Sequence, residues 1–463
     1  MRNGRAEGVT DQVVKELDHK RFNSLVGASR SPAAAYISEE LGWYANDGET
    51  IIGVLLLDTI DHDYAAVILA RDEGGRFRAF DQECSIATRE EALSWLQDTI
   101  AAHTEAGVLV VPQGGEPVGV DLFTPIVAHE KLHPYFVALS SDSVFFPARS
   151  IISGLMPHYA DVDGNFVEQF QSTGFDARLW ELYLYAYLIE EQLFIDRSMN
   201  APDFIIKKYG KTVAIEAVIV GRKPENPPTY LKEPSRPPTP DEVLEATMQS
   251  MPIKFGSPLY SKLTKEYWNL SHVKGNPLVF AIADFHDDMS MLWSSTALMN
   301  YLYGVKHDWH YDEKNQLIIT PSPIAMHKID GKMIPSGFFN QPGAENISAI
   351  LSSASGTISK FNRLGRQAGF SVPNIQMIRM GMCYDHDPNA SVPRMFRYEV
   401  DETSEETWGE GLSMFHNPNA MHEVPRELFP SIAHHYLREG QIVSFMPEFQ
   451  PYASYTLNMR MTD

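Results

Sequence analysis

Three carboxylates stand in apolar surroundings within one short part of the chain. Glu216 is the only charge in the run 213–220, whose small and β-branched residues predict a buried strand. Asp203 follows Pro202 at the start of the preceding predicted strand, and Glu181 lies on an apolar predicted helix. A buried carboxylate needs a cation, a metal ion or a proton. Because hard carboxylate oxygens suit Mg²⁺ or Mn²⁺, we expect a divalent-metal site formed by Asp203, Glu216 and Glu181.

Each carboxylate also has a simpler interpretation. Glu181 has Arg178 three positions earlier, at the spacing of an ion pair on one helix face. Asp203 is a candidate turn or cap residue, as is common after a proline. Glu216 needs a partner whatever its role, since a strand interior contains no water to solvate it.

The elements around these residues predict an α/β fold. Apolar periodicity indicates a mixed central sheet covered by helices on both faces. A stretch with seven prolines, residues 224–240, is expected as an exposed insertion. The other expected elements are a helix over 179–194, a hairpin of 204–206 and 212–220, helices over 241–250, 258–268 and 294–302, and strands over 278–283 and 347–351.

The order of these residues and elements resembles the PD-(D/E)XK, or restriction-endonuclease-like, nuclease superfamily. The resemblance rests on Glu181 in Trp180-Glu181-Leu182, on Pro202-Asp203, and on Glu216-Ala217-Val218, and it covers roughly residues 175–355. It implies a restriction-endonuclease-like core in which the Asp and the Glu bind Mg²⁺ and the helix Glu joins them. It also implies hydrolysis of phosphodiester bonds, more often in DNA than in RNA, with a role in restriction, repair or anti-phage defence.

The sequence departs from that family at one position. A lysine that orients or activates water is expected two residues after the Glu, where this chain has Val218. We expect Lys262 or Lys265, on the following predicted helix, to replace it. Lys207 and Lys211 on the hairpin are expected to face solvent. The alternative is a nuclease-like scaffold that has lost catalysis, holds Glu216 with an Arg or Lys, and binds nucleic acid or another protein.

Charge is distributed unevenly along the chain. The net charge is −22, and residues 36–108 carry fifteen acids against four arginines. Residues 202–223 and 254–274, in contrast, each have a net charge of +3. We therefore expect nucleic acid to bind in a local basic groove, and the acidic N-terminal part to bind a protein or a second copy of the chain. The alternative is that the basic residues are ordinary solvated surface lysines.

The length predicts more than one domain. We expect an acidic α+β domain over residues 1–125 and the nuclease-like domain, with a C-terminal extension, over residues 126–463. The apolar runs are too short to span a bilayer and the N-terminus lacks an apolar leader, so we expect a cytoplasmic protein without membrane contact. Two cysteines, Cys84 and Cys383, exclude a disulfide framework and a cysteine-based zinc site.

Other polar clusters compete with this site. Residues 284–288 (Asp-Phe-His-Asp-Asp) follow an apolar strand, and we favour a polar loop that caps the next helix. The alternative is a site at the carboxyl end of that strand, in which His286 reaches a metal or a phosphate. His307 and His310 have a spacing that zinc can use but lie among loop signals, without the Glu of a His-Glu-x-x-His motif. We interpret the pair at 434–435 as histidines on a helix, at an interface or at the surface, and His416 as part of a turn.

Overall fold

The structure, a computed structural model, describes residues 14–114, 121–223 and 239–461. These form two compact units, one of residues up to Asp121 together with Ser153–Tyr159, and one of Leu122–Ile152 with the chain from Ala160 onward. The sequence placed the division after residue 125 and contains no sign that Ser153–Tyr159 belongs with the first unit.

The first unit is an antiparallel sheet with a helix on each face. Within its described residues the strands follow the order β1-β2-β3-β4-β5. Phe22 and Val26 of α1 pack against Ile52 and neighbouring residues on one face. Leu96 of α2 packs with its neighbours on the other face. The elements are β1 Lys15–Glu16, α1 His19–Val26, β2 Ser38–Ala45, β3 Ile51–Asp58, β4 Tyr64–Arg71, β5 Phe77–Ile86 and α2 Arg89–Glu105.

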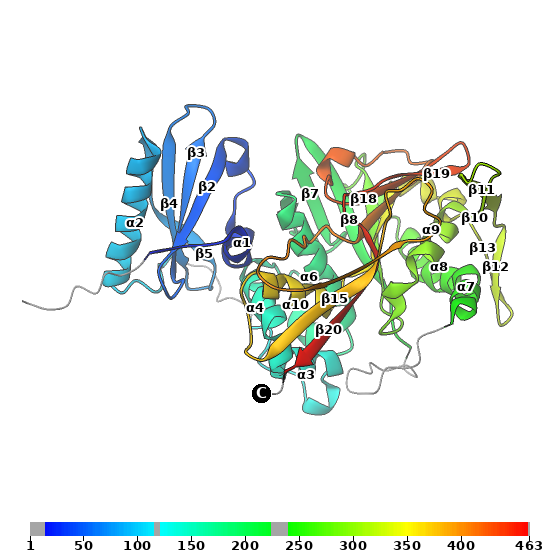
Figure 1. The fold of residues 1–463 in the computed structure, drawn as a ribbon, viewed down its shortest axis with the longest axis horizontal. Helices are drawn as coiled ribbons and strands as arrows, with labels where there is room; N and C mark the ends of the chain where they lie inside the picture. The colour runs from blue at the N-terminus through cyan, green and yellow to red at the C-terminus, as the bar shows by residue number, and fades with distance from the viewer. Residues whose placement is uncertain (1–13, 115–120, 224–238, 462–463) are drawn as a thin grey trace, which may run out of the picture. The chain divides into compact units, whose positions relative to one another are not determined.

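The second unit is built around a large mixed sheet (Figure 1). In the part of the chain that the structure describes, its eight strands follow the order β19-β18-β17-β14-β9-β8-β7-β6. Strand β8 pairs in parallel with β9, and β9 with β14, while β7 and β8 form an antiparallel hairpin. The strands are β6 Phe194–Asp196, β7 Phe204–Lys208, β8 Lys211–Val220, β9 Leu278–Asp284, β14 Ala349–Ser353, β17 Leu412–His416, β18 Ala433–Arg438 and β19 Gln441–Phe445.

Helices cover both faces of this sheet, as expected for the fold class. Helices α8 (Ser250–Leu263) and α9 (Ser295–Tyr303) pack on the face that carries Ala214, Val218 and Val220 of β8. Helix α6 (Phe175–Glu190) lies on the other side, where the Trp180 indole donates a hydrogen bond to the carbonyl of Ala281. The remaining helices are α3 Pro134–Ser141, α4 Phe146–Leu155, α5 Phe166–Gln171, α7 Pro240–Met248 and α10 Ile358–Gln367.

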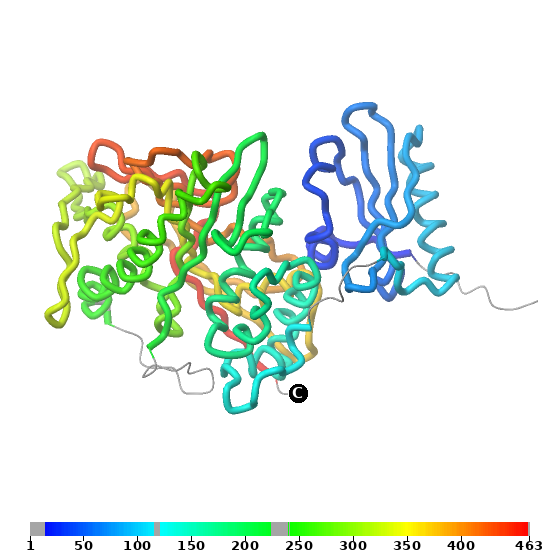
Figure 2. Tube along the Cα trace, turned by 180° about the vertical axis from the view of Figure 1, so that it is seen from behind, coloured from blue at the N-terminus to red at the C-terminus, as the bar shows by residue number. Residues whose placement is uncertain are grey.

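Smaller elements complete this unit, and the trace seen from behind follows their path (Figure 2). A second sheet has the order β16-β15-β20, and two hairpins, β10–β11 and β12–β13, stand apart from the large sheet. Their bounds are β10 Val305–Tyr311, β11 Leu317–Pro323, β12 Met326–Ile329, β13 Lys332–Pro335, β15 Ile375–Cys383, β16 Arg394–Glu399 and β20 Pro451–Arg460. None of the helices among the described residues is long and apolar enough to cross a membrane.

Three expectations about individual elements are wrong. The helix expected over 258–268 begins at Ser250 and ends at Leu263, because the chain turns at Glu266 with a φ of 51°. Residues 434–435 belong to strand β18 and not to a surface helix, and both histidines are buried. Residues 307–310 also lie on a strand, β10, and not in a loop.

Candidate functional site

Glu216 lies in the middle of β8 with its side chain only 6% exposed. Side chains alternate along a strand, so Glu216 shares the face of Val218 and Val220, against which α8 packs. Its Oε1 atom accepts a hydrogen bond of 2.8 Å from the Tyr267 hydroxyl and forms an ion pair with Lys262. The buried carboxylate therefore has two polar partners, both from α8 or the turn after it.

Asp203 lies immediately before β7, beside the middle of β8. The hairpin register pairs Phe204 with Ile215, and the Asp203 Oδ2 atom accepts a 2.7 Å hydrogen bond from the Ala217 amide. Burial and the negative charge of Glu216 raise the pKa of Asp203 to about 6, against the opposing effects of that amide, Lys262 and Arg197. The two carboxylates are thus close enough to interact electrostatically.

Lys262 is the lysine beside Glu216, although the chain has Val218 where the resemblance leads one to expect a lysine. Val218 is buried in the apolar core between β8 and α8, where it has no polar role. Lys262 extends from the last turn of α8, and its ammonium group lies against Glu216. Lys265, the other candidate, is exposed in the turn that follows. Lys207 and Lys211 are exposed, as expected.

Glu181 is held by two guanidinium groups. Arg178 donates to both of its carboxylate oxygens at 2.9 and 3.0 Å, and Arg197 lies 3.8 Å away. The ion pair with Arg178 that the sequence offered as an alternative is therefore present. Arg197 also donates to the main-chain carbonyl of Asp203 at 3.3 Å, which links Glu181 to the site through an intermediate residue.

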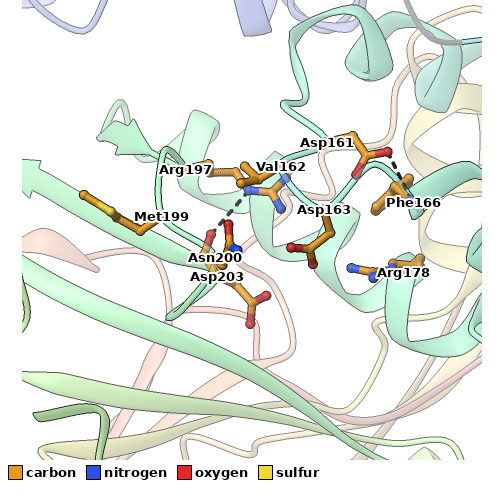
Figure 3. A pocket seen from close by; sticks show the side chains of 9 residues that line it. All are labelled: Asp161, Val162, Asp163, Phe166, Arg178, Arg197, Met199, Asn200 and Asp203. Atoms are coloured by element: carbon orange, nitrogen blue, oxygen red, sulfur yellow. Dashed lines mark hydrogen bonds between the residues drawn. The ribbon is translucent and has the colours of Figure 1, made fainter. Parts of the chain in front are cut away.

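A small polar cavity adjoins Asp203 on this side. Its volume is about 20 Å³, enough for one water molecule. Figure 3 shows Asp163, Arg178, Arg197 and Asp203 around it, with the hydrogen bond from Arg197 to Asp203 drawn as a dashed line. The backbone of Asp203 is therefore fixed from this side, while its carboxylate is fixed by β8.

Asp203 and Glu216 are the residues of this site that could hold a divalent cation. A Mg²⁺ ion keeps several waters and commonly uses only one or two protein carboxylates. Burial and, after it, the negative charge of Glu216 raise the pKa of Asp203, and a nearby cation would offset the repulsion between the two carboxylates. Among the described residues no group of three or more His, Cys, Asp or Glu forms a candidate metal cluster, so Glu181 does not complete one with them.

Sequence reasoning missed two residues of this arrangement. Tyr267 lies in a short 3₁₀ turn, Tyr267–Asn269, and nothing in the residues around it marks it as a partner of Glu216. Arg197 follows β6, and only its distance of six residues from Asp203 connects the two in the sequence. A signal that could have pointed to Tyr267 is the lone buried carboxylate itself, because it needs hydrogen-bond donors from the elements packed on its strand.

The competing clusters serve other contacts. Asp284, at the end of β9, bonds to the His286 ring at 2.6 Å. Asp288 accepts a hydrogen bond from Tyr135 and pairs with Arg222, both at 2.6 Å. His307 and His310 are three positions apart on a strand, so their side chains lie on opposite faces and do not suit one zinc ion.

Comparison of the chain with protein-family models, with curated proteins and with solved structures finds no match.

Proposed function

We propose that this protein is a divalent-metal-dependent nuclease that hydrolyses phosphodiester bonds, with DNA as its substrate. The observation that carries the proposal is the grouping of Asp203, Glu216, Lys262 and Tyr267 between β8 and α8. Two acidic residues on a mixed sheet and a lysine from the helix packed on it are groups that metal-dependent phosphodiester hydrolysis can use.

The order of elements supports a restriction-endonuclease-like core. A helix, α6, precedes the antiparallel hairpin β7–β8, and a helical crossover then leads to β9 in parallel with β8. A second crossover through α9 leads to β14, also parallel to its neighbour. Asp203 stands at the head of the first hairpin strand and Glu216 within the second, as in the resemblance described above.

Each polar group has a distinct task in this proposal. Asp203 and Glu216 would hold Mg²⁺ or Mn²⁺, which when bound activates a water molecule and offsets charge on the phosphate. Lys262 places a positive charge where a non-bridging phosphate oxygen gains negative charge. Tyr267 orients the Glu216 carboxylate through its hydrogen bond. Arg197 fixes the main chain of Asp203, and Glu181 fixes Arg197.

One observation favours a second candidate, a nuclease-like scaffold without catalysis. The ammonium group of Lys262 already neutralises Glu216, and Glu181 is neutralised by Arg178 and Arg197. Glu216 and Glu181 are therefore balanced by side chains without a metal ion. In this case the chain would act as a nucleic-acid-binding or protein-interaction subunit.

A cleavage assay separates the two candidates. The full chain is incubated with supercoiled plasmid, linear duplex, single-stranded DNA and RNA, in Mg²⁺, Mn²⁺ or EDTA. The nuclease predicts cutting that requires the metal and is lost in Glu216→Gln, while the matched surface variant Lys265→Ala cuts normally. Absence of cutting on every substrate, or equal cutting by Glu216→Gln, would contradict the nuclease.

A further inference from the structure

A cavity of about 500 Å³ lies at the carboxyl end of β8, next to α8. Its volume is in the range of pockets that bind small molecules. One side is the end of β8 and the residues after it, a second is α8, and His286 contributes from the loop after β9. The lining residues are Ile219, Val220, Gly221, Lys223, Lys254, Ser257, Pro258, Ser261 and His286.

The lining suits an anion joined to an apolar group. Two lysines, two serine hydroxyls and an imidazole line the cavity, and none of the lining residues that the structure describes is a carboxylate. Ile219, Val220 and Pro258 form an apolar part of the wall. A phosphate linked to a sugar and a flat base presents this combination of charge and apolar surface.

Lys254 is one of the two lysines that line the cavity. It is half-buried, and removal from water together with the charge of Lys223 lowers its pKa, while the carboxylates of Asp284 and Asp287 oppose this shift. Asp284 is bonded to His286 at 2.6 Å. A partly desolvated ammonium group interacts with a phosphate more strongly than a fully hydrated one does.

The cavity is aligned with the candidate catalytic site. Lys254, Pro258 and Lys262 are spaced four residues apart on α8, so they follow one another along one side of the helix. Eight residues of helix separate Lys254 from Lys262 by about 12 Å. Along β8, Val220 is four residues beyond Glu216, which is about 13 Å. Because stacked nucleotides advance about 3.4 Å each, this distance corresponds to about three to four nucleotides.

We propose that this cavity binds one nucleotide of the strand whose phosphodiester bond lies at Asp203 and Glu216, with its phosphate at Lys254 and Lys223 and its base or sugar against Val220 and Pro258. The inference rests on the proposed function and adds a substrate subsite to it. The subsite fixes the strand several nucleotides from the site of hydrolysis.

The test measures binding without cleavage. The Glu216→Gln chain is titrated into a fluorescent single-stranded 12-mer in EDTA, and anisotropy gives Kd at several salt concentrations. Adding Lys254→Ala should weaken binding about tenfold and reduce the slope of log Kd against log salt by about one. Lys254→Arg should restore most of the affinity, and Lys265→Ala should change neither quantity.

A second pair of variants tests whether weaker binding comes from the cavity itself and not from misfolding. Ser257 lines the cavity and is exposed, so Ser257→Asp adds a repelling charge without a change in the core. Thr264→Asp adds the same charge at an exposed position outside the lining. The proposal predicts weaker binding for the first variant alone, and equal effects of the two would overturn it.

Competition with unlabelled ligands shows whether the cavity binds a nucleotide within a strand or a free nucleotide or phosphate. An unlabelled 12-mer should displace the labelled strand at concentrations at least a hundredfold below those of a mononucleotide or inorganic phosphate. A mononucleotide that competes equally well overturns the assignment to a strand. Binding is measured in Glu216→Gln and cutting in the wild-type chain. Binding through Lys254 without cutting by the wild type would therefore refute the proposed function and not the subsite.

Discussion

Lys262 and Glu216 form an ion pair across the interface between α8 and β8, although 46 residues separate them in the sequence. The pair explains how a strand can contain a carboxylate in an otherwise apolar run. It also places a lysine beside the carboxylates although Val218 stands where the nuclease family has one. The same contact that stabilises the fold therefore supplies the cation that the proposed chemistry needs.

Replacement of Lys262 should separate catalysis from binding. Lys262→Met keeps much of the apolar stem but removes the charge, and we expect a loss of about 10²-fold to 10³-fold in the single-turnover cleavage rate. The affinity for DNA should change by less than tenfold. A rate for Lys262→Met equal to that of Lys265→Met, its exposed counterpart, would contradict the role of Lys262.

Asp203→Asn should abolish cleavage and yet stabilise the protein. The folded-state pKa of Asp203 is raised to about 6 from an ordinary value of 3.8, so ionisation costs folding energy as the pH rises from 4 through 6. With a discount for its partial exposure, we expect the variant to be about 1–2 kcal/mol more stable at pH 8. Near pH 4 the advantage should disappear. Urea unfolding at the two pH values measures this, and a destabilised variant at pH 8 would contradict it.

Glu181→Gln should reduce the cleavage rate less than Glu216→Gln does. Glu181 contacts Arg178 and Arg197, and it reaches Asp203 only through Arg197. We expect a cleavage rate within about tenfold of the wild type, with a loss of about 1–3 kcal/mol in stability because two partly buried guanidinium groups lose a charged partner. If Glu181→Gln instead abolishes divalent-metal binding while it remains folded, the residue is a metal ligand after all.

The buried histidines of β17 and β18 should make the second unit sensitive to acid. Burial and neighbouring imidazoles lower the pKa of His416 to about 3 and that of His435 to about 4, from 6.5. Since the unfolded chain then takes up protons first, stability falls as the pH drops below about 6.5. We expect each residue to account for about 2 kcal/mol at pH 5. The urea midpoint should fall between pH 7 and pH 5, and His416→Gln should reduce that fall; a constant midpoint would contradict the argument.

The elements near the site could be predicted from residue patterns because each is strongly periodic or strongly apolar. The hairpin that contains Asp203 and Glu216, strand β9 and helix α6 all appear close to their expected positions. The end of the helix that carries Lys262 could not be predicted from the sequence. A left-handed residue at Glu266 and a proline inside the helix, Pro258, leave the helical pattern ambiguous there. Residues 434–435 were misassigned for a similar reason, since a short strand with two histidines has no apolar alternation.

The composition of the site depended on contacts between distant segments. The sequence indicates that Glu216 needs a partner, but only the packing of α8 on β8 shows that this partner is Lys262 together with Tyr267. Glu181 and Asp203 are near each other in sequence, yet Arg197 lies between them in space. Propensity describes single elements, whereas which side chains meet is decided by register and packing angle.

The central claim is that Asp203 and Glu216 together hold a divalent cation, and calorimetric titration with Mn²⁺ tests it most directly. The wild-type chain should bind Mn²⁺ at this site, and Glu216→Gln, checked for native unfolding behaviour, should lose that binding while Lys265→Ala keeps it. Absence of binding to the wild type, or equal binding by Glu216→Gln, would contradict the account and leave the non-catalytic scaffold.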